Sequence, residues 1–176
     1  VDAPASNYDM YSEDELRLRS RNADIAAMLA LSERLFADGA SLDGHNEGFD
    51  WLDEAGARGS TQAVKLRAEE LLKHVTQTQP DLSEAGLSLY QEAAAYYLVA
   101  AMMMGDKAAI EEIPTILPAM LSRQDVSSIL RGGYGTYQKI MAHRAYLGLP
   151  PYVAEFPPYD VQGLIRAANL GREDGG

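Results

Sequence analysis

Apolar residues recur at three- and four-residue steps along most of the chain, which is the spacing of one face of an α-helix. This pattern predicts helices over residues 12–22, 23–37, 47–59, 60–75, 83–104, 106–121, 122–147 and 160–170. Nowhere do apolar and polar residues alternate over five or more positions, so no strand is predicted. The predicted fold class is therefore all-α.

Local signals refine three of these helices. The sequence Ser12-Glu-Asp-Glu15 has the pattern of a capping box, which marks a helix start. Pro114 and Pro118 predict that the helix over 106–121 is kinked or split. Gly132 and Gly133 predict a break that divides residues 122–147 into two helices.

A degenerate repeat accompanies the helices. Its pattern is Ala-x3-Gly-x3-small, and bulky residues precede it. Such spacing suits a helix hairpin, because alanine lets the neighbouring helix approach and glycine takes the left-handed turn at the helix end. The residues in this register are Trp51, Ala55, Gly59 and Ala63, then Tyr97, Ala101, Gly105 and Ala109, then Ala167 and Gly171, with Ala27, Leu31 and Leu35 on the helix before the first unit.

These residues resemble the Sel1-like repeat family, a class of tetratricopeptide-like α-solenoids. The chain departs from the family pattern where Ser32 replaces a glycine, Leu35 a tyrosine and Gly56 an alanine. The units also lie 46 and 66 residues apart, against a family period of about 36. The resemblance implies a short α-solenoid of helix hairpins with an inserted segment. An ordinary helical bundle, in which small residues also recur at four-residue steps, remains the alternative.

The long gap before the third unit predicts an insertion over about residues 122–160. Insertions in repeat arrays often contain the residues that bind a specific partner. This insertion is rich in aromatic residues. Rings with a polar tip are typical of protein interfaces. The candidate partner-binding residues are Tyr134, Tyr137, Tyr152, Phe156 and Tyr159. The alternative is that these rings pack the irregular chain against the last helix.

Charge and composition exclude several classes of function. The chain has 15 Lys and Arg against 26 Asp and Glu, a formal net charge of −11, which disfavours binding to nucleic acid or to anionic lipid. A partner with a basic surface fits this charge better. There is no cysteine, so no disulfide, cysteine-ligated metal or thiol nucleophile is expected. No apolar stretch reaches the roughly 20 residues of a membrane span.

Candidate chemistry is sparse. His45, His74 and His143 lack a partner at the spacing of a metal-binding helix, so we expect no metal site and no cofactor. The abundant acids fall mainly at helix starts and on polar faces, and no catalytic residue is predicted. Glu92 lies among alanines on the most apolar helix and is the first acid to consider for an enzyme. A small helical hydrolase is therefore the alternative to a binding protein.

The resemblance implies a protein-binding role. Bacterial Sel1-like proteins are often exported, and some are immunity proteins that neutralise a secretion-system effector. Residues 1–11 are small and polar and lack an initiator methionine, so we expect the disordered remnant of an export leader or lipid anchor before a single domain over 12–176. A chain trimmed from a longer protein is the alternative. We expect a periplasmic or envelope location, with a cytoplasmic one as the alternative. A scaffold for envelope assembly is a further alternative function.

Overall fold

The computed structural model describes residues 8–37, 42–78, 83–106, 108–109 and 123–154. Within these ranges the chain forms six long helices and no strand, which confirms the predicted all-α class. The helices are α1 (Glu13–Arg21), α2 (Ile25–Leu35), α3 (Leu42–Ala57), α4 (Thr61–Thr78), α5 (Glu84–Met103) and α7 (Arg123–Tyr146). Most of the predicted helix over 106–121 and all of that over 160–170 lie outside the described residues.

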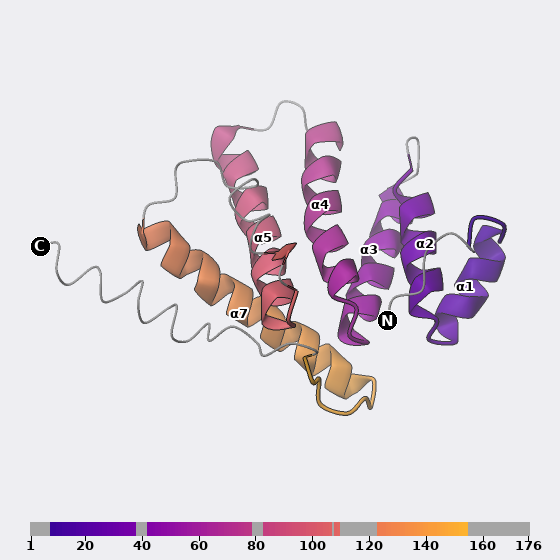
Figure 1. The fold of residues 1–176 in the computed structure, drawn as a ribbon. Helices are drawn as coiled ribbons and strands as arrows, with labels where there is room; N and C mark the ends of the chain where they lie inside the picture. Colours follow the sequence, from indigo (N-terminus) through magenta and orange to yellow (C-terminus); the bar gives the residue numbers. More distant parts are fainter. Residues whose placement is uncertain (1–7, 38–41, 79–82, 107, 110–122, 155–176) are drawn as a thin grey trace, which may run out of the picture.

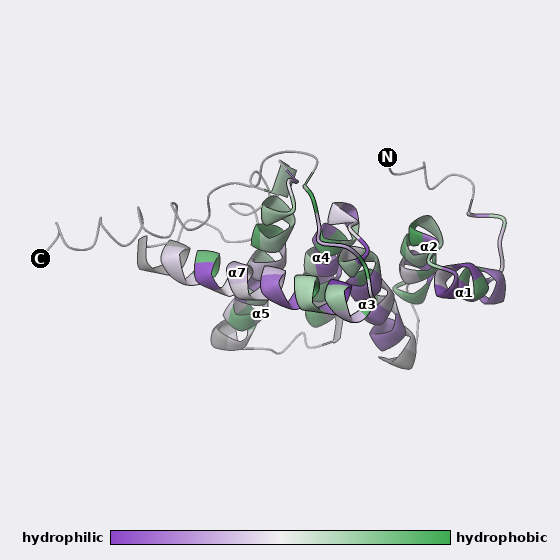
Figure 2. Ribbon diagram, turned by 90° about the horizontal axis from the view of Figure 1, so that it is seen from below, coloured by the Kyte–Doolittle hydropathy of each residue, from purple (hydrophilic) through white to green (hydrophobic). Residues whose placement is uncertain are grey.

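Helices α1 to α5 stand in a row, and each packs against the helix before it and the helix after it (Figure 1). Helix α7 runs obliquely along α5 and reaches α3 (Figures 1 and 2). Because α7 crosses the row, residues far apart in the sequence meet along it. No helix among the described residues is long and apolar enough to cross a membrane.

The largest buried cluster lies between α4, α5 and α7. Its members on α5 are mostly small, and Ala94, Ala95, Leu98 and Val99 are fully buried. Side chains of this size let two helix axes approach closely. Figure 2 shows the contrast along the chain, since α5 carries many hydrophobic positions and α1 mainly hydrophilic ones. Two smaller clusters lie among α1 to α4.

The predicted break at Gly132 and Gly133 is wrong, because α7 continues through both residues. A Cβ at Gly132 would lie 2.3 Å from the ring of Tyr96, and one at Gly133 would lie 2.3 Å from Cβ of Val99. Both distances are shorter than the closest approach of a real Cβ to another atom, so neither site has room for a side chain. The two glycines therefore allow α7 and α5 to approach, and do not end a helix.

The start of α3 also differs from the prediction. Residues 42–46, expected to belong to a loop, are already helical. Tertiary contacts hold this first part of α3 against α2. The ring of His45 lies 5.8 Å from that of Phe36, and in the next turn Ser32 Oγ donates a 3.1 Å hydrogen bond to the carbonyl of Gly48. A Cβ at Gly48 would lie 2.8 Å from the ring of Phe36. Packing against α2 thus outweighs the low helix propensity of the glycines.

Three helix junctions share one pattern of hydrogen bonds. In each, an amide donates to the carbonyl five residues earlier, a residue with positive φ takes the turn, and a side-chain oxygen accepts from an amide in the next helical segment. These are the bonds of a helix C-terminus that leads directly into a capped helix. The junction residues are Arg19, Ala23, Asp24 and Ala27; Ala55, Gly59, Ser60 and Ala63; and Ala101, Gly105, Asp106 and Ala109.

The residues assigned to the repeat occupy the interior of this row where they are described. The buried ones are Ala27, Leu31, Leu35, Ala55, Ala63, Ala101 and Ala109. Trp51 and Tyr97 are partly buried and pack against the core clusters. Gly59 and Gly105 take the positive φ angles of two junctions. Ala167 and Gly171 lie outside the described residues. At the start of the row, the capping box of Ser12 and Glu15 is confirmed.

Candidate binding site

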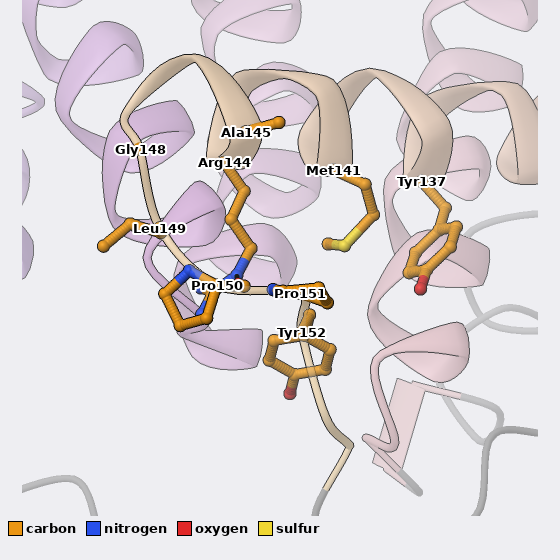
Figure 3. A pocket seen from close by; sticks show the side chains of 9 residues that line it. All are labelled: Tyr137, Met141, Arg144, Ala145, Gly148, Leu149, Pro150, Pro151 and Tyr152. Atoms are coloured by element: carbon orange, nitrogen blue, oxygen red, sulfur yellow. Dashed lines mark hydrogen bonds between the residues drawn. The ribbon is translucent and has the colours of Figure 1, made fainter.

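A surface groove lies between the C-terminal half of α7 and the segment that turns back after it (Figure 3). Its volume is about 580 Å³. We call it the α7 groove. Its lining residues are Tyr137, Met141, Arg144, Ala145, Gly148, Leu149, Pro150, Pro151 and Tyr152. Apart from Arg144 the lining is apolar, aromatic or small, a composition common in sites that bind apolar groups.

Two hydrogen bonds fix the groove to the ends of α3 and α5. Arg144 Nη1 donates to the carbonyl of Ala57 at 3.0 Å, and its Nε donates to the carbonyl of Pro150 at 2.6 Å. The hydroxyl of Tyr152 donates to the carbonyl of Met104 at 3.0 Å. Ala57 and Met104 are at helix C-termini, where carbonyls lack partners within the helix. The groove is therefore built on two of the three equivalent junctions.

Part of the lining of the groove is exposed to solvent. Ala145, Pro150 and Pro151 line the groove and are exposed. In Figure 3, Tyr137 and Met141 extend from α7 towards the returning segment that carries Pro151 and Tyr152. Apolar side chains gathered at a concave surface are typical of a site for a polypeptide partner.

The predicted partner-binding residues separate into three groups. Tyr137 and Tyr152 both line the α7 groove, although 15 positions separate them. Tyr134 does not line the groove; like Tyr137 and Tyr152, it is partly buried and packs against the cluster between α4, α5 and α7. Phe156 and Tyr159 lie outside the described residues. The structure therefore brings two of the five together at a surface.

A second cavity lies between α7, α3 and α5, and we call it the Asp53 cavity. Its volume is about 370 Å³. Helix α3 contributes Asp53, whereas α5 and α7 contribute the other lining residues, which are Ala93, Tyr96, Tyr97, Thr136, Lys139, Ile140 and His143. It combines one acid, two bases and several rings or aliphatic groups in a small space.

Asp53 lies beside a cation that is held between two rings. Arg67 Nε is 3.3 Å from Asp53 Oδ1, and the Arg67 Cζ lies 3.9 Å from the ring centre of Phe49 and 5.1 Å from that of Tyr97. Burial raises the pKa of Asp53, and the charge of Arg67 opposes this rise. Burial, followed by the charge of Asp53, also raises the pKa of Tyr97. Nη1 of Arg67 is buried and makes no hydrogen bond.

The bases of the Asp53 cavity come from α7. Lys139 and His143 are one helical turn apart, and no ion pair joins either of them to Asp53 or to another described acid. His143 is nevertheless near enough that its charge, when it is protonated, lowers the pKa of Asp53. The hydroxyl of Tyr97 makes no hydrogen bond with a described residue. A carboxylate paired with Arg67, a tyrosine hydroxyl and two bases thus reach one cavity from three helices.

Asp53 was not predicted as a site residue, because its place in the sequence is that of an acid on a polar helix face. Its only signal was its position near Trp51 and Leu52, and the pairing with Arg67 depends on how α3 and α4 pack. The predicted enzyme candidate, Glu92, accepts a hydrogen bond from Tyr96 on the same helix and lines neither cavity.

Histidines do not form a metal centre in the described part of the chain. His45 packs with its ring 5.8 Å from that of Phe36, whereas His143 lines the Asp53 cavity. The side chain of His74 is outside the described set. No group of three or more potential ligand side chains occurs among the described residues. Comparisons of the chain with known protein families, with characterised proteins and with solved structures found no match.

Proposed function

We propose that this chain is a protein-binding helical-repeat domain that holds a partner polypeptide in the α7 groove. The observation that carries the proposal is the attachment of the groove to the ends of α3 and α5 through Arg144 and Tyr152. This attachment holds the returning segment against α7, and Tyr137, Met141 and Tyr152 line the concavity while also packing against the core cluster. Rigid grooves of this kind lower the entropic cost of binding.

The three junctions support a repeat architecture of the Sel1-like kind. Their turn residues are Ala23, Gly59 and Gly105, so the first two are 36 positions apart and the last two are 46 apart. The shorter interval equals the family period, which the spacing of the sequence motifs did not reveal. The contacts of α1 to α5 with successive neighbours also suit an α-solenoid. The helix α7 is then an addition that crosses the row and provides the binding surface.

The partner we propose has an apolar anchor and a basic surface. A ring or aliphatic side chain would occupy the groove between Met141 and Tyr152, beside the exposed Ala145. The net charge of −11 would speed its association with a positively charged protein. These properties suit an exported immunity protein that neutralises a bacterial secretion-system effector, in the periplasm or at the envelope. An envelope scaffold would instead bind several partners weakly.

The experiment is affinity capture followed by a measured affinity. The tagged chain is used to isolate partners from its source cells, and each purified partner is titrated against the wild type and the double variant Pro151→Ala, Ala145→Glu. Both residues line the groove and are exposed, so the variant is expected to retain its fold. We expect one dominant partner and a loss of affinity of about tenfold or more in the variant.

The matched control is Leu18→Ala, Leu89→Glu. These residues are 62% and 67% exposed, on α1 and α5, and do not line the groove. The control variant is expected to bind as the wild type does. If both double variants bind the partner with the wild-type affinity, the groove is not the binding surface. Several weak partners would favour the scaffold.

A further inference from the structure

The Asp53 cavity contains charged and polar groups that the proposed protein-binding surface does not use. Asp53 comes from α3, Tyr97 from α5, and Lys139 and His143 from α7. Within the described residues, Asp53 pairs only with Arg67, through Oδ1, and Lys139 has no ion pair. Lys139 is exposed, and the side chain of Asp53 is 42% exposed. Both charges are therefore accessible to a ligand in the cavity.

The charges are divided between the helices. Helix α3 supplies a carboxylate, and α7 supplies an ammonium group and an imidazole one turn apart. They line the same cavity and yet form no ion pair with each other. A ligand with a single charge would satisfy one side only. A ligand with an ammonium and a carboxylate would satisfy Asp53 and Lys139 at once.

The remaining lining sets the nature and size of the ligand. Ala93, Ile140 and the ring of Tyr96 form an apolar part of the cavity, and the hydroxyl of Tyr97 is a further donor. A volume of about 370 Å³ is near the lower end of the roughly 300–1,000 Å³ of small-molecule sites. The space therefore suits a small molecule with an apolar side group.

We propose that the Asp53 cavity binds a small zwitterion of the amino-acid class, with its ammonium on Asp53, its carboxylate on Lys139 and His143, and an apolar side group against Ile140 and Tyr96. Burial raises the pKa of Asp53, so it disfavours the ionised carboxylate. A ligand ammonium would stabilise that ionised form, which supports this arrangement. The site is separate from the α7 groove, since the two share no lining residue.

The test is calorimetric titration of the full chain with three matched probes. L-leucine carries both charges, isocaproate lacks the ammonium, and isoamylamine lacks the carboxylate. We expect L-leucine, or the larger zwitterion L-phenylalanine, to bind, and isocaproate and isoamylamine to bind about tenfold more weakly or worse. Absence of binding by both amino acids at about 10 mM would overturn the proposal. Isocaproate or isoamylamine binding as tightly as L-leucine would overturn it too.

Two variants assign the charges. Lys139→Met, at an exposed position, is expected to weaken the binding of L-leucine and isocaproate about tenfold and to leave the binding of isoamylamine unchanged. Asp53→Asn is expected to weaken the binding of L-leucine and isoamylamine and to leave the binding of isocaproate unchanged. Circular dichroism verifies the fold of Asp53→Asn. If Asp53→Asn is unfolded, the affinities measured with Lys139→Met decide the test.

The matched controls are on the same two helices. Asp50→Asn lies on α3 and Arg131→Met on α7, both at exposed positions that line neither cavity. Both are expected to bind L-leucine as the wild type does. Equal L-leucine affinity in the wild type and Lys139→Met would contradict the assignment of the carboxylate to α7.

Discussion

The guanidinium of Arg144 donates a 3.0 Å hydrogen bond to the carbonyl oxygen of Ala57, which lies 87 positions earlier at the last residue of α3. The same guanidinium donates to Pro150 and lies 5.6 Å from the ring centre of Tyr152. One side chain therefore connects α7, the segment that returns after it and the row of helices α1 to α5. Its hydrogen bonds hold the returning segment in place along the α7 groove.

Replacing this side chain is expected to destabilise the chain and to open the groove. Arg144→Ala removes two hydrogen bonds from a charged donor and should lower the free energy of unfolding by about 1–3 kcal/mol, measured by urea denaturation. Arg131→Ala, at an exposed position on the same helix, is expected to change it by less than about 0.5 kcal/mol. Equal effects of the two substitutions would show that the bond to Ala57 contributes nothing specific.

The glycines of α7 give a second prediction. Replacing glycine by alanine is expected to lower the free energy of unfolding at one site and to raise it at another. Gly133→Ala places a Cβ against Val99 and should destabilise the chain by about 1–3 kcal/mol. Gly135→Ala meets no atom within 4 Å and should stabilise it by about 0.5–1 kcal/mol through helix propensity. Thermal and urea unfolding measure both. A stabilising Gly133→Ala would contradict the close approach of α5 and α7.

The same glycines show what a sequence can and cannot predict. The helical spacing of apolar residues and the helix-capping residues predicted the all-α class, the start of α1 and the five helices of the row. They could not distinguish a glycine that ends a helix from one that lets another helix approach, because this depends on the partner's position. Asp53 was missed for the same reason, since its pairing with Arg67 and its cavity depend on contacts between helices.

Ala23 was missed for a different reason. It takes the turn of the first junction with φ of 67°, where Gly59 and Gly105 take the other two. Alanine gives no turn signal in the sequence, so the repeat of 36 positions was hidden. The candidate tyrosines were predicted by composition alone, and composition does not tell which of them face a groove.

A third prediction follows from this turn. A left-handed conformation costs alanine about 1–2 kcal/mol, and glycine adopts it readily at a smaller entropic cost. Ala23→Gly should therefore raise the free energy of unfolding by about 0.5–1 kcal/mol. Gly59→Ala should lower it, because φ is 112° and the new Cβ would lie 3.2 Å from the ring of Tyr152. A destabilising Ala23→Gly in urea unfolding would argue against strain at the first junction.

A fourth prediction concerns pH. Glu47 accepts two hydrogen bonds from Arg17, at 2.8 and 3.0 Å, and one from Trp51, and these bonds lower the pKa of Glu47. The unfolded chain then binds a proton more readily, so this contribution to stability is present above the ordinary glutamate pKa of 4.5 and is lost as the pH falls through the folded value. It amounts to about 0.5–1 kcal/mol because solvent reaches the pair.

The measurement is the free energy of unfolding between neutral and acid pH. Glu47→Gln should be less stable than the wild type near neutral pH, and the difference should shrink on acidification. Glu33→Gln, at an exposed position on α2, serves as the control and should show no such convergence. A difference between Glu47→Gln and the wild type that stays constant with pH would contradict the role of the ion pair.

The central claim is that a protein partner occupies the α7 groove. It is tested most directly by placing a photo-crosslinking residue at position 145, which lines the groove and is exposed, and at position 89, on the exposed face of α5. Irradiation in the source cells is followed by identification of the crosslinked peptides. We predict a single partner polypeptide attached through position 145 and little product through 89. Equal products at both positions, or a product only at 89, would contradict the claim.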